Sequence, residues 1–130
     1  MCSPFLMIRI AGYWKTILIA AVILYFSLLR DPNYSLPPVH YGDKWAHLLA
    51  YAILGAIAFW DANTANKMGW SILLIAFVCP LLYGGAIEIV QEYFFYPRTG
   101  SWGDWLADCI GVAMGYGIIA AYLKIKKSKQ

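Results

Sequence analysis

The sequence predicts an all-α integral membrane protein, a bundle of four transmembrane helices with short loops. Of its 130 residues, 62% are hydrophobic and only 13% are charged, a balance outside the range of soluble globular domains. Four apolar runs are long enough to cross the hydrocarbon core of a bilayer, which is ~30 Å thick and needs about 20 helical residues. Because the segments between these runs are short, we expect a single domain over residues 1–130. The runs lie at residues 10–29, 44–60, 70–93 and 105–123.

The first run is predicted to be a retained helix rather than a cleaved signal peptide. Arg9 and Lys15 lie near its beginning, as in a signal sequence, but no small-x-small cleavage site follows the apolar residues. The next segment, residues 30–43, contains three prolines and several turn-forming residues. This composition favours an extended surface loop.

The other connections and the C-terminal end are also short. Residues 61–69, DANTANKMG, are predicted to form a polar turn, and the last residues, KIKKSKQ, a basic tail. Pro80 lies midway along the third run, where we expect a kink because proline removes a backbone hydrogen bond. Trp102 and Trp105 flank the start of the fourth run and are expected to anchor it at the level of the lipid headgroups.

The ten basic residues divide unequally between the two sides of the membrane. With four helices, both termini and the 61–69 turn share one side, which receives seven basic residues, and the other side receives three. The positive-inside rule then places the termini in the cytoplasm and the loops at 30–43 and 94–104 outside. The basic tail fits contact with anionic lipid, and no folded domain supports a nucleic-acid site. We therefore expect membrane lipids as partners and no nucleic acid, and the sequence assigns no oligomeric state.

Polar residues recur on one face of three of the predicted helices. In each stripe the ionisable side chains lie toward the predicted outer end and a glycine lies deeper. Three helices therefore place polar atoms at a similar depth, and the glycines allow the helices to pack closely below them. The stripes are Asp43, His47, Tyr51 and Gly55 in the second run, Gly84, Glu88 and Gln91 in the third, and Asp104, Asp108, Gly111 and Gly115 in the fourth.

Glu88 is the carboxylate whose depth is easiest to judge from the sequence. It lies seven residues before Phe95, where we place the interfacial aromatic residues. At ~1.5 Å per helical residue, it lies about 10 Å inside the membrane. Insertion of a charge at the centre of a helix costs about 2.5 to 3.5 kcal/mol, so Glu88 is expected to be protonated, paired with a cation or in a wet cavity. The cations available to it are Lys44, His47 and Arg98.

The order of these motifs resembles the VanZ-like family of small bacterial membrane proteins, over roughly residues 43 to 117. One departure is Asp108, at a position where family members usually have asparagine. The resemblance implies a multi-pass protein of the bacterial cytoplasmic (inner) membrane and a link to tolerance of the glycopeptide antibiotic teicoplanin. It supplies no settled reaction, cofactor or substrate. The motifs that carry it are Asp43-Lys44-x-x-His47-x-x-x-Tyr51, Glu88-x-x-Gln91, Pro97-Arg98, and Asp104 followed by a helix with Gly111 and Gly115.

The favoured functional hypothesis is a polar pocket, open to the outer leaflet, that engages the headgroup of an envelope lipid or lipoglycopeptide. Cations and carboxylates beside aromatic residues suit such a ligand, and Lys44 and Arg98 would meet its phosphate. The residues predicted to form this pocket are Asp43, Lys44, His47, Tyr51, Glu88, Gln91, Arg98, Asp104 and Asp108.

Two other hypotheses use the same residues. In an enzyme acting on a lipid-linked phosphoryl or acyl substrate, His47 or Glu88 would be the general base and Asp104 an acid or an orienting group. In a structural protein, the residues would form a buried polar network that fixes helix packing. The sequence requires no cofactor, and we assign no metal site. The side chains that would offer ligands to manganese, magnesium or zinc are Asp43, His47, Glu88, Asp104 and Asp108.

Overall fold

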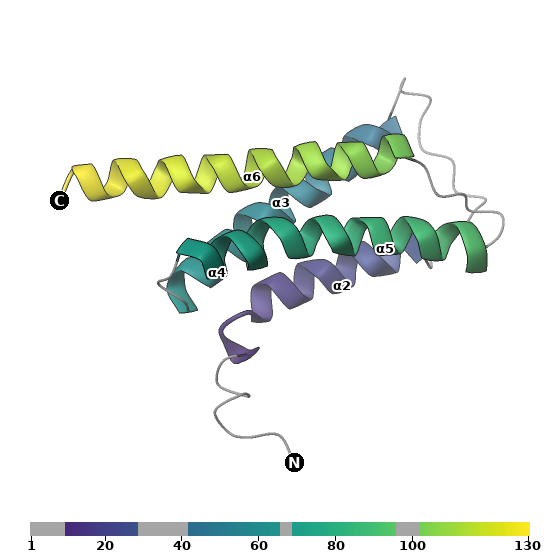
Figure 1. The fold of residues 1–130 in the computed structure, drawn as a ribbon, viewed down its shortest axis with the longest axis horizontal. Coiled ribbons are helices and arrows are strands. Elements are labelled where there is room, and N and C mark those ends of the chain that lie inside the picture. The colour runs from purple at the N-terminus through teal and green to yellow at the C-terminus, as the bar shows by residue number, and fades with distance from the viewer. Residues whose placement is uncertain (1–9, 29–41, 66–68, 96–101) are drawn as a thin grey trace, which may run out of the picture.

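The computed structural model describes residues 10–28, 42–65, 69–95 and 102–130, and these residues contain helices and no strand (Figure 1). The predicted all-α bundle of four helices is confirmed. The helices are α2 (Trp14–Leu28), α3 (Gly42–Ala65), a continuous run of α4 (Gly69–Leu73), the π-helical segment η1 (Leu74–Val78) and α5 (Cys79–Phe94), and lastly α6 (Trp102–Ser128).

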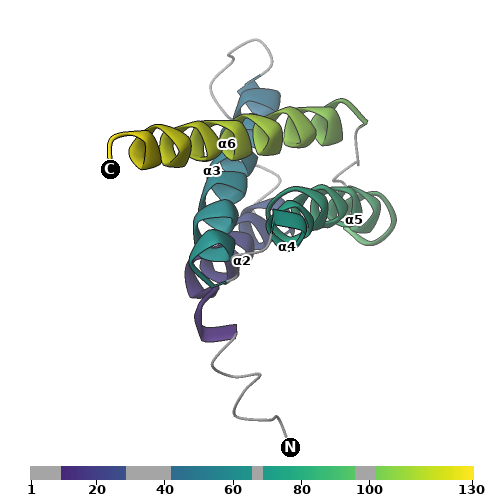
Figure 2. The ribbon, with the colours of Figure 1, turned by 60° about the vertical axis from the view of Figure 1, so that its left-hand side comes forward.

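Successive helices run in opposite directions along the bundle (Figure 1). Helices α3 and α6 therefore point the same way, and they cross in contact in both views (Figures 1 and 2). Their mutual contact is the most extensive between any two helices in the described residues. The C-terminal ends of α2 and α5 and the N-terminal ends of α3 and α6 lie at one end of the bundle, which we call the Trp102 end. The opposite end, where α6 finishes, is the Ser128 end.

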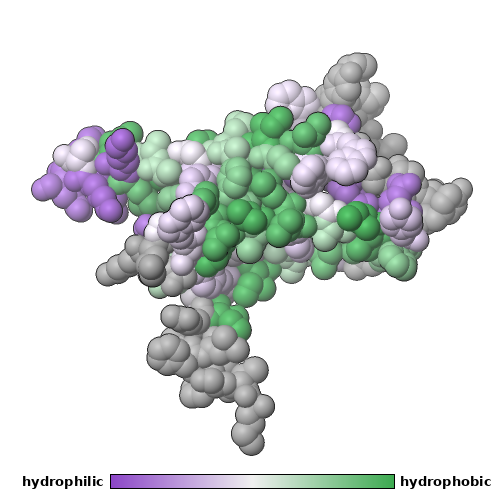
Figure 3. All heavy atoms as spheres, viewed as in Figure 1, coloured by the Kyte–Doolittle hydropathy of each residue, from purple (hydrophilic) through white to green (hydrophobic). Residues whose placement is uncertain are grey.

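The surface of the bundle has the polarity of a membrane-spanning protein. Figure 3 shows an apolar band, in green, between polar atoms at the C-terminal end of α6 and polar atoms at the other end. Large apolar side chains such as Leu82 and Ile118 are 68% and 62% exposed, which suits contact with hydrocarbon. Helix α2 is apolar and shorter, and the three helices long and apolar enough to cross a membrane are Lys44–Ala65, Gly69–Phe94 and Trp102–Ser128.

Glycines allow the backbones of α3 and α6 to approach each other closely. A Cβ added at Gly111 would overlap the carbonyl oxygen of Leu48, and one at Gly115 would overlap that of Ala52. On the α3 side, a Cβ at Gly55 would lie 2.9 Å from a backbone carbonyl oxygen of α6. Small residues permit such contacts between membrane helices. This glycine seam fixes how the two helices are aligned, and so which side chains face each other nearer the Trp102 end.

The π-helical segment η1 ends two residues before Pro80, where the sequence predicts a kink. The backbone N–H of Cys79 donates to the carbonyl oxygen of Leu74, five residues earlier in the chain rather than four. Proline cannot donate a backbone hydrogen bond, and π-helical turns are a known local adjustment within α-helices. The run therefore stays helical from Gly69 to Phe94.

The turn predicted at residues 61–69 is wrong in its first part, because α3 continues through Asp61 to Ala65. Asp61 is only 2% exposed. Its Oδ2 accepts hydrogen bonds from the backbone N–H and the hydroxyl of Thr16, at 3.1 and 2.8 Å. Its Oδ1 lies 3.7 Å from Lys15 Nζ. These partners on α2 make Asp61 part of the packed bundle rather than of a solvated turn, and we call the three residues the Asp61 cluster.

The basic tail predicted at the C-terminus is largely helical. Helix α6 extends to Ser128 and projects beyond its neighbours (Figure 1). Lysine is a strong helix former, and cations in a last turn interact favourably with the helix dipole. Of the loop predicted at residues 30–43, only Gly42 and Asp43 are in the described part of the chain, and they begin α3.

Candidate functional site

The alignment of α3 with α6 pairs polar side chains near the Trp102 end. Lys44 Nζ lies 3.2 Å from Asp104 Oδ1. About one turn further along both helices, His47 Nδ1 lies 2.8 Å from Asp108 Oδ1. Residues three or four positions apart share a helix face. Two residues one turn apart on α3 therefore meet two residues one turn apart on α6. The glycine seam, which lies further from the Trp102 end, fixes the alignment of the two helices and so determines both pairings.

Helix α5 adds a second carboxylate to the pair formed by His47 and Asp108. Glu88 Oε1 lies 4.0 Å from His47 Nδ1. Gly84, one turn before Glu88, permits this approach, because a Cβ there would lie 2.8 Å from Asp108 Oδ2 and 3.2 Å from the ring of Tyr51. Three helices therefore meet at one point. The polar cluster, as we call it, consists of Lys44, His47, Glu88, Asp104 and Asp108.

The carboxylates of the polar cluster are buried. Asp108 is 0% exposed, Glu88 7% and Asp104 8%. One oxygen of Asp108 faces His47, whereas its Oδ2 has no hydrogen-bond partner among the described residues. A buried polar atom without a partner costs free energy because it has lost its hydrogen bonds to water. Asp108 Oδ2 is thus an unused acceptor inside the bundle.

The other residues predicted for the site lie in different surroundings. The ring of Tyr51 is 2% exposed and parallel to that of His47, with 6.5 Å between the ring centroids. Gln91 donates from its side chain to the carbonyl oxygen of Ser27 at 2.7 Å, so it joins α5 to α2. The two predicted residues whose side chains lie outside the described residues are Asp43 and Arg98.

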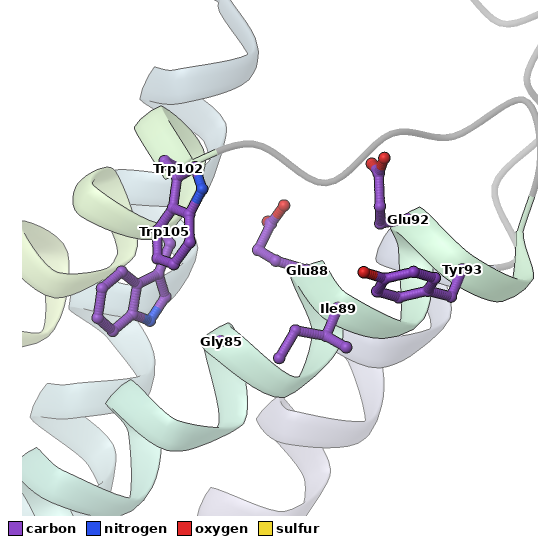
Figure 4. Close-up of a pocket in the computed structure, with 7 residues that line it drawn as sticks. All are labelled: Gly85, Glu88, Ile89, Glu92, Tyr93, Trp102 and Trp105. Atoms are coloured by element: carbon purple, nitrogen blue, oxygen red, sulfur yellow. The ribbon is translucent and has the colours of Figure 1, made fainter.

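A pocket of about 490 Å³ lies beside Glu88, between α5 and α6. Figure 4 shows Glu88 and Glu92 projecting from the same side of α5, with Trp102 and Trp105 across the pocket on α6. The volume, the aromatic walls and the small number of polar groups are typical of small-molecule sites. The lining residues are Gly85, Glu88, Ile89, Glu92, Tyr93, Trp102 and Trp105.

Trp105 is a fixed wall of this pocket. Its indole N–H donates to the carbonyl oxygen of Leu81 at 3.0 Å. The indole lies over Gly85, where a Cβ would come within 3.2 Å of the ring nitrogen. Trp102 packs edge-on against Trp105 with 5.8 Å between ring centroids, and it is 81% exposed. The headgroup-anchoring role predicted for both tryptophans therefore fits the exposure of Trp102 alone.

A family model described as VanZ/LLP1 matches residues 2–124. The chain belongs to the VanZ/LLP1 family. The match covers nearly the whole sequence and confirms the resemblance indicated by the motifs on the second, third and fourth helices. No curated protein and no solved structure matches the chain significantly. This VanZ/LLP1 protein is accordingly a membrane protein.

Several pocket residues of this VanZ/LLP1 chain were not predicted from the sequence. Gly85, Ile89 and Glu92 follow one another at helical spacing on α5, and that spacing was the available signal. The predicted stripe begins instead at Gly84, on the neighbouring face of the helix that carries Glu88. Glu88 contributes both to the polar cluster and to the lining of the pocket.

Part of the polar cluster has the composition and spacing of a metal site. His47, Glu88 and Asp108 each offer one ligand atom, and these three atoms lie within 4.8 Å of one another. Asp104, which the sequence also offered as a ligand, is paired with Lys44 instead. The His47–Asp108 pair also resembles the imidazole–carboxylate pairs used in acid–base catalysis. His47, Glu88 and Asp108 can therefore bind a cation, and the His47–Asp108 pair can move a proton.

Proposed function

We propose that this VanZ/LLP1 protein binds the polar headgroup of a cell-envelope lipid or a lipoglycopeptide in the pocket between α5 and α6. The observation that carries the proposal is the pocket itself, about 490 Å³ in volume beside Glu88 at the Trp102 end. Pockets of this size hold ligands as large as a headgroup. The family resemblance favours the glycopeptide teicoplanin as one such ligand.

The chemistry of the lining supports a headgroup rather than a wholly apolar ligand. Glu88 and Glu92 supply carboxylates that can accept hydrogen bonds from hydroxyl or ammonium groups. The indoles of Trp102 and Trp105 supply flat apolar faces, which also attract cations. A ligand that carries sugar hydroxyls or an amine next to an apolar portion matches both kinds of wall.

The distribution of basic residues supports an outward-facing pocket in a bacterial cytoplasmic membrane. Lys124, Lys126 and Lys127 lie near the Ser128 end of α6, and Lys15 lies near the beginning of α2 at the same end of the bundle. Cytoplasmic ends of membrane helices carry an excess of lysine and arginine. This distribution supports a cytoplasmic Ser128 end and a pocket at the outer leaflet, where envelope lipids and glycopeptides are encountered.

Catalysis is the second candidate function, and the 2.8 Å contact between His47 and Asp108 favours it. A general base must reach the substrate directly or through one water molecule. Among the described residues, however, the pocket lining includes neither His47 nor a serine, threonine or cysteine. Binding is therefore the function that the geometry supports best, and loss of binding without any chemical turnover is the expected behaviour of pocket variants.

Paired tryptophan variants test the proposal. Trp102→Ala removes an exposed wall of the pocket, and Trp70→Ala removes a tryptophan of similar exposure, 76% against 81%, at the other end of the bundle. Loss of an aromatic anchor in a binding site typically costs ~2 kcal/mol, so the affinity should fall roughly 30-fold in Trp102→Ala. Trp70→Ala should bind as the wild type does.

The measurement is titration of the protein in lipid nanodiscs with teicoplanin and, separately, with an undecaprenyl-linked lipid. Growth of a teicoplanin-sensitive bacterium that expresses each variant, at matched protein levels, provides the cellular readout. Equal affinity of the wild type and Trp102→Ala for both ligands would contradict the proposal. So would equal losses in Trp102→Ala and Trp70→Ala, because these would report a general effect on the membrane region.

A further inference from the structure

Three side chains with metal-binding groups converge where α3, α5 and α6 meet. His47 comes from α3, Glu88 from α5 and Asp108 from α6, and one ligand atom of each lies within 4.8 Å of the other two. We propose that these three residues bind one divalent transition-metal cation, Zn²⁺ or Mn²⁺. The site is distinct from the headgroup pocket, although Glu88 contributes to both.

The distances suit a shared cation. His47 Nδ1 lies 2.8 Å from Asp108 Oδ1 and 4.0 Å from Glu88 Oε1. Bonds from zinc to nitrogen or oxygen ligands are ~2.0–2.2 Å long, which separates neighbouring ligand atoms by about 3–4 Å. The observed atoms already lie near that range. Binding of a shared cation would require only a small change in the 4.0 Å distance between Glu88 Oε1 and His47 Nδ1.

Asp108 provides an independent indication of a ligand. The residue is 0% exposed, and its Oδ2 has no hydrogen-bond partner among the described residues. A carboxylate that binds a cation through both oxygens has no unsatisfied atom, whereas one that binds only His47 does. A site with two carboxylates and a neutral imidazole also cancels the charge of a divalent cation, which favours burial.

The donor set selects the class of metal. Imidazole nitrogen favours zinc and other transition metals, and carboxylate oxygen is shared by zinc and manganese. Calcium takes six to eight oxygen ligands and magnesium retains several waters, so three residues that include a histidine suit them less well. Glu88 also lines the pocket, which gives the cation an access path from the Trp102 end.

The described lysine beside the site is bound to a carboxylate that is not a proposed ligand. Lys44 is bound to Asp104 at 3.2 Å, and Asp104 is not one of the three converging residues. Asp104 is nevertheless a buried carboxylate one turn from Asp108 on the same helix. Asp104→Asn is therefore a matched control, because it removes the same charge from almost the same place without removing a proposed ligand.

Metal content of the purified protein tests the inference. Wild-type protein in detergent is stripped with a chelator, incubated with Zn²⁺ or Mn²⁺ alone, desalted and analysed by elemental mass spectrometry. We expect one metal ion per chain, and a rise in unfolding temperature on metal addition. Asp108→Asn and His47→Gln should each bind the metal at least tenfold more weakly and lose that rise. Asp104→Asn and Trp102→Ala should retain both properties.

X-ray absorption at the zinc edge gives a readout that a purely structural role would not produce. We expect a shell of nitrogen and oxygen neighbours with the signature of one imidazole, which disappears in His47→Gln. Helix content measured without metal shows whether each variant is folded. If Asp108→Asn does not fold, the metal content of His47→Gln tests whether the site binds metal. Retention of no metal by the folded wild type would overturn the inference. Equal loss in Asp104→Asn and Asp108→Asn would also overturn it, since this would indicate a general effect of charge.

Discussion

Two buried carboxylates, Asp61 and Asp108, lie toward opposite ends of the bundle and use their oxygens differently. Asp61 accepts two hydrogen bonds from Thr16 and lies 3.7 Å from the ammonium group of Lys15. Asp108 faces His47 with one oxygen, and the other has no hydrogen-bond partner among the described residues. The fold itself satisfies Asp61. Asp108 retains an acceptor beside two further potential metal ligands, and this difference separates a packing interaction from a candidate site.

The position of each carboxylate along its neighbouring helices explains the difference. Asp61 meets the first turn of α2, where Thr16 has a backbone N–H with no partner within its own helix. A carboxylate there also interacts favourably with the positive end of the helix dipole. Asp108 faces His47 in the second turn of α3 and lies beside Gly84 within α5, where backbone N–H groups are already used. Only side chains or a ligand can bind its oxygens.

The largest effect is expected from Gly115→Ala, which alters the seam beneath the polar cluster and leaves the Asp61 cluster in place. The added Cβ would overlap the carbonyl oxygen of Ala52. Overpacking against backbone should cost about 3 kcal/mol of unfolding free energy, measured by chemical denaturation in detergent. Gly117→Ala is the control, because nothing lies within 4 Å of its Cβ, and it should be neutral or stabilise by up to ~1 kcal/mol. Similar effects of the two substitutions would mean that the seam does not hold the helices together.

An effect of ~2 kcal/mol is expected from Asp61→Ala. The substitution leaves the partly buried backbone N–H and hydroxyl of Thr16 without their acceptor, and an unpaired donor in such a place costs about 1–3 kcal/mol. The side chain of Lys15 is 45% exposed, so loss of its ion pair should add little. Asp61→Asn keeps an acceptor oxygen and should cost about half as much. The same denaturation experiment measures both, and teicoplanin and metal binding should be unchanged in the folded fraction. Reduced binding by a folded Asp61 variant would show that the two ends of the bundle are not separable.

The smallest effect on stability, within ~1 kcal/mol, is expected from Asp108→Asn measured with a chelator present. Asparagine keeps an oxygen that accepts a hydrogen bond from His47 and removes a carboxylate oxygen that has no hydrogen-bond partner in the described part of the chain. Chemical denaturation of Asp108→Asn and Asp61→Ala in parallel gives the comparison. A loss in Asp108→Asn as large as that in Asp61→Ala would indicate that Asp108 serves packing.

The helices and the polar stripes were predictable because they depend on local sequence. The length of an apolar run decides whether a helix can cross a membrane, and the four-residue spacing of His47 and Tyr51 places them on one face. The glycines at 111 and 115 indicated close packing correctly, because a missing side chain has the same consequence beside any neighbour. The family followed from the combined order of these motifs.

The partners of individual polar residues were not predictable, because they depend on how distant helices pack. Gln91 was grouped with Glu88 from its spacing, yet its amide reaches Ser27 on α2. Asp61 was assigned to a polar turn because it follows an apolar run, whereas its hydrogen bonds to Thr16 depend on the packing of α2 against α3. Trp105 was interpreted as a surface anchor. Its hydrogen bond to the carbonyl oxygen of Leu81 forms only because α5 packs against α6, which the sequence does not show.

Native mass spectrometry of the protein released from bacterial membranes tests most directly whether the Trp102 end is a binding site. The account predicts wild-type chains that carry a non-covalently bound lipid or lipoglycopeptide and one metal ion. Trp102→Ala should lose the organic ligand and keep the metal, Asp108→Asn should lose the metal, and Trp70→Ala should keep both. Bare wild-type chains, or identical bound masses in all four proteins, would contradict the account and leave the polar cluster as a packing interaction like that of Asp61.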